Sequence, residues 1–228
     1  MKGASWSRFV LFLCFLLVPI QVSAQDEIII EGAHYPEGLF WDQRTSTLYY
    51  AEMPRDRIMR HVSGAPSVFF AHKGCGPTGI APIGDQWAIA CHIGRSLVIA
   101  DQEGRFVREI KSDGEGRALQ NPNDIVSDGT GVYLSDSGTF NPKAPASGAI
   151  YYWRPGHDMA RLLSGLHYAN GVTIKPDGET LFVSEHLGRR ILAVPINTPG
   201  HLGEPRVFAE ISKLITSLGP LTGPDGLE

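Results

Sequence analysis

The chain has 228 residues, of which 43% are hydrophobic and 19% are charged, a composition that supports a buried core and excludes disordered and fibrous proteins. Its 20 Lys and Arg against 24 Asp and Glu give a net charge of -4, so no nucleic-acid partner is expected. The 26 glycines and 16 prolines favour many short strands joined by turns. We therefore expect an all-β protein.

The first 24 residues have the pattern of a secretory signal peptide. Lys2 and Arg8 precede the apolar run Phe9–Ile20, and the small residues Ser23 and Ala24 follow it. A membrane anchor is the alternative, but the run is shorter than the roughly 20 residues that span a bilayer. We expect residues 1–24 to be removed, which leaves an exported protein, periplasmic or secreted, with no stable membrane anchor.

Two cysteines, Cys75 and Cys91, remain in the mature part of the chain. An oxidising compartment would permit them to pair. Two buried thiols in neighbouring strands are an equal alternative, and the sequence leaves the choice open.

A repeat runs through residues 25–228. A polar residue precedes a short apolar run at five places, with intervals of 41, 45, 47 and 55 residues: Glu37, Thr78, Asn123, Asn170 and Asp225. Each of the first four is followed by three further strand-like segments, which in the first unit are Leu48–Met53, Arg57–Val62 and Pro66–Ala71. Four strands in a repeat of about 40 to 50 residues predict the blades of a β-propeller. A β-sandwich, the alternative, would not repeat its starts in this way.

The later units follow the same pattern. In the second unit the expected strands are Gly79–Ile83, Gln86–Ile93, Ser96–Asp101 and Phe106–Ile110; the outer strands of the third and fourth are Ala149–Arg154, Met159–Ser164, Arg190–Ile196 and Pro205–Ile211. A fifth unit begins at Asp225 and ends with the chain. We expect a C-terminally truncated propeller with about four blades present and the fifth just started; a complete four-bladed protein with a short tail is the alternative.

The five blade starts should converge at one end of the propeller axis, because the innermost strand of each blade lines the central channel. All five side chains are oxygen donors, which suit a hard divalent cation: Ca²⁺ most naturally, with Mg²⁺, Mn²⁺ and Zn²⁺ as alternatives. For any one of them, a turn-capping role is the plainer interpretation. Their equivalent positions favour a metal site.

A second ring is expected one strand outward on the same face, because the next strand is antiparallel and returns to it. Its members follow their blade starts by 15, 14, 13 and 15 residues: Glu52, His92, Asp136 and Glu185. They would contact substrate or support the metal ligands. Solvated loop residues are the alternative.

Four segments carry a resemblance to a known family: PEGLFWD at 36–42, NPNDIVSDGTGVYLSDSG at 121–138, ANGVTIKPDGETLFVSE at 169–185 and GPDGLE at 223–228. In this order they resemble the six-bladed propellers of the senescence marker protein, gluconolactonase and luciferin-regenerating enzyme family (regucalcin-like). HKGCGPTGI at 72–80 resembles the branch with bacterial gluconolactonases and drug-responsive lactonases.

The resemblance implies that the metal ligands are Glu37, Asn123, Asn170 and Asp225. It also implies that Asp225 doubles as the general base that takes a proton from the attacking water. Some sugar-lactone members carry an arginine at the position of Asn121, which we expect, with Thr78, to contact the substrate. This difference places recognition of a sugar-acid lactone in doubt.

Together, the ligand set and the resemblance predict a metal-dependent hydrolase that opens a small-molecule lactone, with the metal as Lewis acid. Nucleophile-elbow, phosphate-loop, dinucleotide and His-Glu-x-x-His motifs are missing from the sequence. The alternative from another class is a non-catalytic propeller that binds a ligand or protein and holds a structural metal. Strictosidine-synthase-like condensation and paraoxonase-like arylester hydrolysis are further alternatives.

Overall fold

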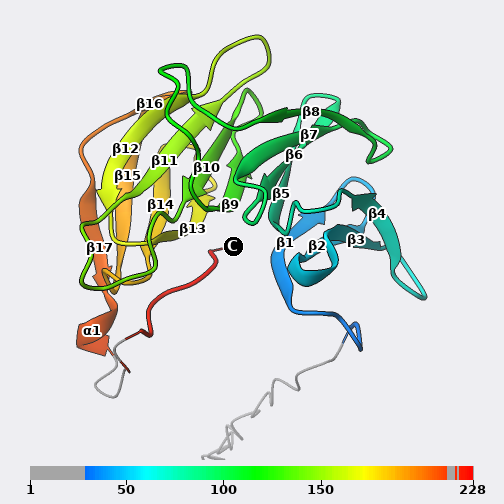
Figure 1. The fold of residues 1–228 in the computed structure, drawn as a ribbon, viewed down its shortest axis with the longest axis horizontal. Helices are drawn as coiled ribbons and strands as arrows, with labels where there is room; N and C mark the ends of the chain where they lie inside the picture. Colours follow the sequence, from blue (N-terminus) through cyan, green and yellow to red (C-terminus); the bar gives the residue numbers. More distant parts are fainter. Residues whose placement is uncertain (1–28, 215–218, 220, 228) are drawn as a thin grey trace, which may run out of the picture. The chain divides into compact units, whose positions relative to one another are not determined.

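Four antiparallel β-sheets of the same design follow one another along the chain in the computed structural model (Figure 1). The structure describes residues 29–214, 219 and 221–227, all of whose strands and helices lie in a compact unit that begins at Gly32. The expected signal peptide, residues 1–24, lies outside the described residues. None of the helices in the described ranges is both long and apolar enough to cross a bilayer.

The first two sheets each run from an inner strand outward through three hairpins. The first sheet contains β1 (Pro36–Asp42), β2 (Thr47–Glu52), β3 (Arg57–His61) and β4 (Ser67–Ala71), with a short 3₁₀ helix η1 (Met53–Arg55) between β2 and β3. The second sheet contains β5 (Pro77–Ile83), β6 (Gln86–Cys91), β7 (Ser96–Ala100) and β8 (Phe106–Ile110).

The third and fourth sheets repeat this order. The third contains β9 (Pro122–Ser127), β10 (Val132–Asp136), β11 (Gly148–Trp153) and β12 (Ala160–Leu166). The fourth contains β13 (Ala169–Ile174), β14 (Thr180–Glu185) and β15 (Arg190–Thr198), and both β16 (His201–Leu202) and β17 (Arg206–Glu210) pair with β15 before helix α1 (Ile211–Leu214). The fold is therefore an all-β propeller with four blades.

Local chemistry explains the hairpins that turn each strand back. In the third blade the Asp128 carboxylate accepts hydrogen bonds from the amides of Thr130 and Gly131, while Gly129 adopts a φ of 83°. Asp and Gly suit such a turn because Asp bonds to the backbone ahead of it and Gly tolerates a positive φ. Asp177 and Gly178 form the equivalent turn in the fourth blade.

The core lies between adjacent blades. One cluster of buried side chains joins the first blade to the second, another joins the second to the third, and a third cluster joins the third to the fourth. Between the first two blades the rings of Tyr49 and Trp87 lie 4.7 Å apart, with Phe40 and Phe69 beside Trp87. Burial of such rings supplies much of the cohesion between blades.

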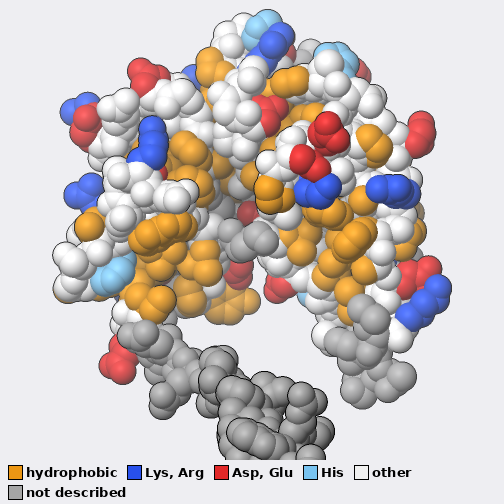
Figure 2. All heavy atoms as spheres, turned by 180° about the vertical axis from the view of Figure 1, so that it is seen from behind, with side chains coloured by type: hydrophobic (Ala, Val, Ile, Leu, Met, Phe, Trp, Pro, Cys, Tyr) orange, Lys and Arg blue, Asp and Glu red, His pale blue; other side chains and the backbone are white. Residues whose placement is uncertain are grey.

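Apolar side chains also remain exposed. Trp41 on β1 and Phe208 on β17 are 56% and 63% exposed, and hydrophobic side chains form patches on the face opposite to that of Figure 1 (Figure 2). Residues 221–227 form no strand in the part of the chain that the structure describes. The expected fifth blade is therefore not observed in this segment.

Cys75 and Cys91 form a disulfide bond across the start of the second blade. Both residues are almost completely buried. The structure thereby selects the paired alternative that the sequence left open.

Candidate active site

The five polar blade starts line the same two adjoining cavities. The first cavity, of about 310 Å³, is lined by Pro36, Glu37, Gly38, Leu39, Thr78, Asn123, Asp124, Asn170, Asp225 and Gly226. The second, of about 210 Å³, is lined by Tyr35, Glu37, Met53, Thr78, His92, Asn123, Phe140, Tyr168, Asn170, His186 and Asp225. Side chains separated by up to 188 residues in sequence thus meet in one place.

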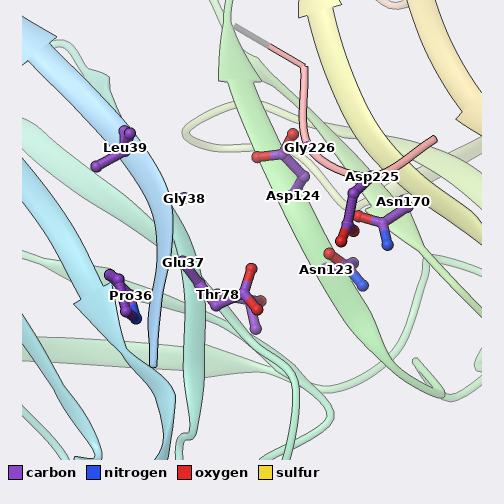
Figure 3. Close-up of a pocket in the computed structure, with 10 residues that line it drawn as sticks. All are labelled: Pro36, Glu37, Gly38, Leu39, Thr78, Asn123, Asp124, Asn170, Asp225 and Gly226. Atoms are coloured by element: carbon purple, nitrogen blue, oxygen red, sulfur yellow. The ribbon is translucent and has the colours of Figure 1, made fainter. Parts of the chain in front are cut away.

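Figure 3 shows how the side chains approach one another. Those of Asn123, Asn170 and Asp225 are turned toward each other, and Glu37 points toward them from β1 beside Thr78. We call Glu37, Asn123, Asn170 and Asp225 the acid–amide cluster.

An irregularity in strand pairing marks the start of every inner strand. The register shifts between Glu37 and Phe40, between Pro77 and Gly79, and between Ala169 and Val172, and β9 shifts opposite Leu134 and Asp136. Bulges of this kind bend a strand and redirect side chains, and they are common beside active sites. At each shift, the polar residue at the start of the blade departs from the regular alternation of side chains between the two faces of the strand.

Two glycines of the recurring motifs permit close approach of backbones. A Cβ on Gly38 would lie 2.2 Å from the carbonyl oxygen of Thr78, and Gly38 has a φ of 38°. A Cβ on Gly171 would lie 2.4 Å from the amide nitrogen of Leu227. A larger residue at either position would push apart the segments that carry the cluster.

Serine hydroxyls tie the cluster together across blades. Ser135 accepts a hydrogen bond from the amide of Asp124 and donates to the carbonyl of Asn170. Ser184, at the equivalent position of the next blade, accepts from the amide of Gly171 and donates to the carbonyl of Asp225.

Further hydrogen bonds orient individual members. The amide Nδ2 of Asn123 donates to the Ser137 hydroxyl at 3.0 Å, which leaves its Oδ1 oxygen available as a ligand. Asp124 is directed away from this role, because its carboxylate accepts a 2.8 Å hydrogen bond from the amide of Val172.

The electrostatics of the cluster are those of two carboxylates without a balancing cation. Burial, and next the negative charge of Asp225, raise the pKa of Glu37 above its ordinary value. No Lys or Arg occurs among the described residues that line either cavity. A divalent cation would relieve this repulsion.

The donor set fits a hard cation. Two carboxylates and two side-chain amides supply oxygen ligands of the kind that Ca²⁺ takes in proteins. Within the described residues, no group of three or more His, Cys, Asp and Glu side chains is arranged to hold a metal, so a metal here requires the asparagines. Zn²⁺ is held in proteins by Cys and His side chains and also by Asp and Glu, of which this cluster offers only the carboxylates.

The residues expected in a second ring have different surroundings. Glu52 and Glu185 are 2% and 0% exposed and pair with Arg57 and Arg190 respectively. Their remaining carboxylate oxygens accept hydrogen bonds from the amides of His34 and His167.

Asp136 completes this pattern in the third blade. It accepts hydrogen bonds from the amides of Gln120, Asn121 and Gly138. None of Glu52, Asp136 and Glu185 is among the described residues that line the two cavities. All three are buried, so the alternative of solvated loop residues is wrong for them. Contact with substrate and support of the metal ligands both stay predictions.

The other residues expected to contact substrate fall into two groups, those that line a cavity and one that does not. Thr78 and His92 line the second cavity, where the Nδ1 atom of His92 bonds to the Pro122 carbonyl at 3.0 Å. Asn121 does not line either cavity in the described part, and its side-chain amide donates to the carbonyl of Gly138 at 2.6 Å.

Four aromatic residues of the second cavity were missed in the sequence: Tyr35, Phe140, Tyr168 and His186. We call them the aromatic rim. A signal existed, because Tyr35 and Tyr168 each stand two residues before a member of the acid–amide cluster, as Asn121 does in the third blade. Both tyrosines have a positive φ, 50° and 61°.

The blades and the oxygen cluster define this protein as a β-propeller with a polar site at one end of its inner strands. The SMP-30/gluconolactonase/LRE-like region matches residues 35–228. The chain therefore belongs to that family, which confirms the resemblance drawn from the sequence. No match was found among curated protein sequences.

Solved structures share the fold at low sequence identity. A gluconolactonase from Xanthomonas campestris aligns with a TM-score of 0.65 and 22% identity over 77% of this chain and 63% of its own. Regucalcin, a calcium-binding protein from Agrobacterium tumefaciens, aligns with a TM-score of 0.63 and 21% identity over 77% of this chain and 59% of its own. A nidogen/laminin complex contains a chain that aligns with a TM-score of 0.62 and 20% identity over 77% of this chain and 65% of its own. The chain thus spans less than two thirds of the length of these structures.

Proposed function

We propose that the acid–amide cluster binds a divalent cation, most naturally Ca²⁺, and that the site hydrolyses a lactone. The observation that carries this proposal is the convergence of Glu37, Asn123, Asn170 and Asp225 at one end of the inner strands. Membership of a family that includes gluconolactonases, and the fold shared with regucalcin, support it. The greater length of these structures supports a six-bladed ring whose fifth blade starts at Asp225.

The residues of the acid–amide cluster would have different roles in ester hydrolysis. Glu37, Asn123 and Asn170 would hold the cation together with Asp225. The bound cation would supply Lewis-acid polarisation of the lactone carbonyl. Asp225 takes a proton from the water whose oxygen attacks the carbonyl carbon. The ring C–O bond then breaks, and the leaving oxygen takes up the proton that Asp225 received, which gives a hydroxy acid and restores the carboxylate.

A non-catalytic binding propeller is the second candidate. The specific observation in its favour is the nidogen/laminin structure, whose TM-score of 0.62 is close to the 0.65 of the gluconolactonase. In this case the cation would only stabilise the blade starts, and the cavities would receive part of a partner.

The proposed function is tested with a panel of lactones assayed with and without a chelator. We expect hydrolysis that EDTA abolishes and added Ca²⁺ restores. Turnover that is insensitive to the chelator would contradict the metal role. No turnover at any Ca²⁺ concentration, in a protein that binds Ca²⁺ by calorimetry, would favour the binding propeller.

We also propose that the protein is exported after removal of residues 1–24. The disulfide between Cys75 and Cys91 supports this, because such bonds persist in oxidising compartments. Expression of the full coding sequence in a bacterium, followed by fractionation and N-terminal sequencing, tests it. A cytoplasmic product that retains Met1 would contradict the proposal.

A further inference from the structure

Three of the four rings of the aromatic rim lie close to one another at the second cavity. The rings of Phe140 and Tyr168 lie 4.8 Å apart in an edge-to-face arrangement, and His186 lies 6.0 Å from each. Tyr35 and Met53 line the same cavity. Aromatic rings arranged in this way offer both faces and edges to a further ring.

The rim is accessible to a ligand. Phe140 is 49% exposed and Tyr35 is 65% exposed, although both have large apolar surfaces. Exposed apolar side chains that border a polar cavity mark a binding surface, because a ligand that covers them removes apolar area from water.

The loop that carries Phe140 is held in place. It connects β10 to β11, and the Asn121 side chain donates a hydrogen bond to the carbonyl of Gly138 at 2.6 Å. The amide of Thr139 donates to the Ser147 hydroxyl at 2.9 Å. Asn121 thus anchors the loop of an aromatic residue rather than presenting its own polar group to the cavity.

Tyr168 connects the rim to the acid–amide cluster. It lines the second cavity together with Glu37, Asn170 and Asp225, and it stands two residues before Asn170 in the sequence.

The second cavity offers few charged groups to a substrate. Its described lining contains two carboxylates and no Lys or Arg. A cation held by the acid–amide cluster would balance these two carboxylates. A charged group on the substrate would then find no Lys or Arg partner among the described residues of this lining.

We propose that the aromatic rim is a subsite for the aryl or apolar substituent of an uncharged lactone. This inference rests on the proposed lactonase function and names its substrate class. The lactone carbonyl lies toward the acid–amide cluster, and the substituent lies against Phe140, Tyr168 and Tyr35.

The test compares two six-membered lactones with opposite substituents. Dihydrocoumarin carries a fused benzene ring, whereas glucono-1,5-lactone carries hydroxyl groups. We expect the wild-type chain to have a higher kcat/KM for dihydrocoumarin. Phe140→Ala should lower that value about tenfold, mainly through KM, and should lower the value for glucono-1,5-lactone much less. Phe140→Leu should recover part of the loss.

Phe208→Ala is the matched control. Phe208 is also a well exposed phenylalanine that contacts another ring, that of Phe182, but it lies on the outer strand β17. A second readout uses chroman, the bicyclic ether that lacks the lactone carbonyl, whose binding is followed by saturation-transfer NMR without turnover.

Four outcomes separate this inference from the proposed function. Preference for dihydrocoumarin that Phe140→Ala abolishes and Phe208→Ala retains supports both. Preference for glucono-1,5-lactone, with no effect of Phe140→Ala, contradicts the proposed subsite at the aromatic rim and is consistent with the proposed lactonase function. Chroman binding that depends on Phe140, without hydrolysis of any lactone, supports an aromatic site and overturns the lactonase. Neither binding nor hydrolysis overturns both.

Discussion

The Ser184 hydroxyl donates a hydrogen bond of 2.7 Å to the main-chain carbonyl of Asp225, 41 residues later in the sequence. The same hydroxyl accepts a hydrogen bond from the amide of Gly171. One side chain of β14 thus joins the inner strand of its own blade to the segment that carries Asp225. Ser135 makes the equivalent connection to Asn170.

Ser184→Ala should loosen the position of Asp225. The change removes the hydrogen bonds of Ser184 with the Gly171 amide and the Asp225 carbonyl, which keep only their own 3.3 Å hydrogen bond to each other. The loss of these two bonds costs about 1–3 kcal/mol in the free energy of unfolding. Loss of such an outer contact should also lower Ca²⁺ affinity about tenfold or more. Calorimetric titration with Ca²⁺ and urea unfolding measure the two effects.

Ser67→Ala is a suitable control for that variant, since Ser67 lies on the outer strand β4 and accepts only a 3.4 Å hydrogen bond from Arg60 in an exposed pair. Its Ca²⁺ affinity should equal that of the wild type. An unchanged Ca²⁺ affinity in Ser184→Ala as well would show that the bridge does not position the cluster.

Glu52 should contribute to stability and not to substrate binding. Burial alone would raise its pKa, but the hydrogen bond from the His34 amide and the pairing with Arg57 together hold the pKa below its ordinary value. A lowered pKa means that the stabilisation is present above the ordinary carboxyl pKa and is lost as pH falls through the folded value.

Glu52→Gln should therefore lower the free energy of unfolding by about 2 kcal/mol at pH 7, and by less near about pH 3. The KM for any hydrolysed lactone should not change. Glu103→Gln, which affects an exposed pair with Arg105, should change stability little. A raised KM with unchanged stability in Glu52→Gln would instead favour direct contact with substrate.

The disulfide should stabilise the second blade. It closes a loop of 16 residues, for which restriction of the unfolded chain is worth about 3 kcal/mol. Reduction with dithiothreitol should lower the Tm of the wild type, and the double variant with Cys75→Ala and Cys91→Ala should have a low Tm that does not respond to the reductant. A wild-type Tm that is the same in both redox states would contradict the prediction.

Much of the blade architecture could be predicted because each strand is short, apolar and bounded by turn residues. The expected segment Phe106–Ile110 is observed without change as β8, and Arg57–Val62 is observed as Arg57–His61. The expected strand Leu48–Met53 ends one residue early because a 3₁₀ helix with Pro54 in its first turn begins at Met53. The two-residue β16 carries too little pattern to be expected.

The convergence of the blade starts could also be predicted, because equivalent residues of a repeat occupy equivalent places. The direction of each side chain could not be predicted from the sequence, because it depends on the bulges and on hydrogen-bond partners that are distant in sequence. The pairing of Glu52 with Arg57 and of Glu185 with Arg190 repeats at a spacing of five residues, a signal that would have indicated an internal role. Phe140 lies in a loop without any repeat, and only the fold brings it to the cavity.

Glu37 should make the stability of the protein depend on both pH and Ca²⁺. Its raised pKa means that the folded state binds its proton more tightly than the unfolded state does. The associated stabilisation is complete below the ordinary carboxyl pKa and is lost as pH rises through the folded value. Glu37→Gln should remove this dependence and stabilise the Ca²⁺-free protein at pH 7.

Added Ca²⁺ should make the wild type more stable than Glu37→Gln, which reverses their order of stability without Ca²⁺. At a concentration about 100-fold above its Kd, a ligand stabilises the folded state by about 2.7 kcal/mol. The Tm of the wild type should rise accordingly, whereas that of Glu37→Gln should rise much less. Equal Ca²⁺-induced shifts in the two proteins would remove Glu37 from the ligand set.

Asp225→Asn separates the two roles proposed for this residue. The amide retains an oxygen ligand, so Ca²⁺ affinity should fall only in part, but it cannot accept the proton of the attacking water. Lactone turnover should therefore drop by a factor of about 10² to 10⁴ in the presence of saturating Ca²⁺. Asp177→Asn, in the exposed hairpin of the fourth blade, should retain full turnover. If Asp225→Asn retains it too, the general base is another group, and His92, which lines the same cavity, would be the next residue to replace.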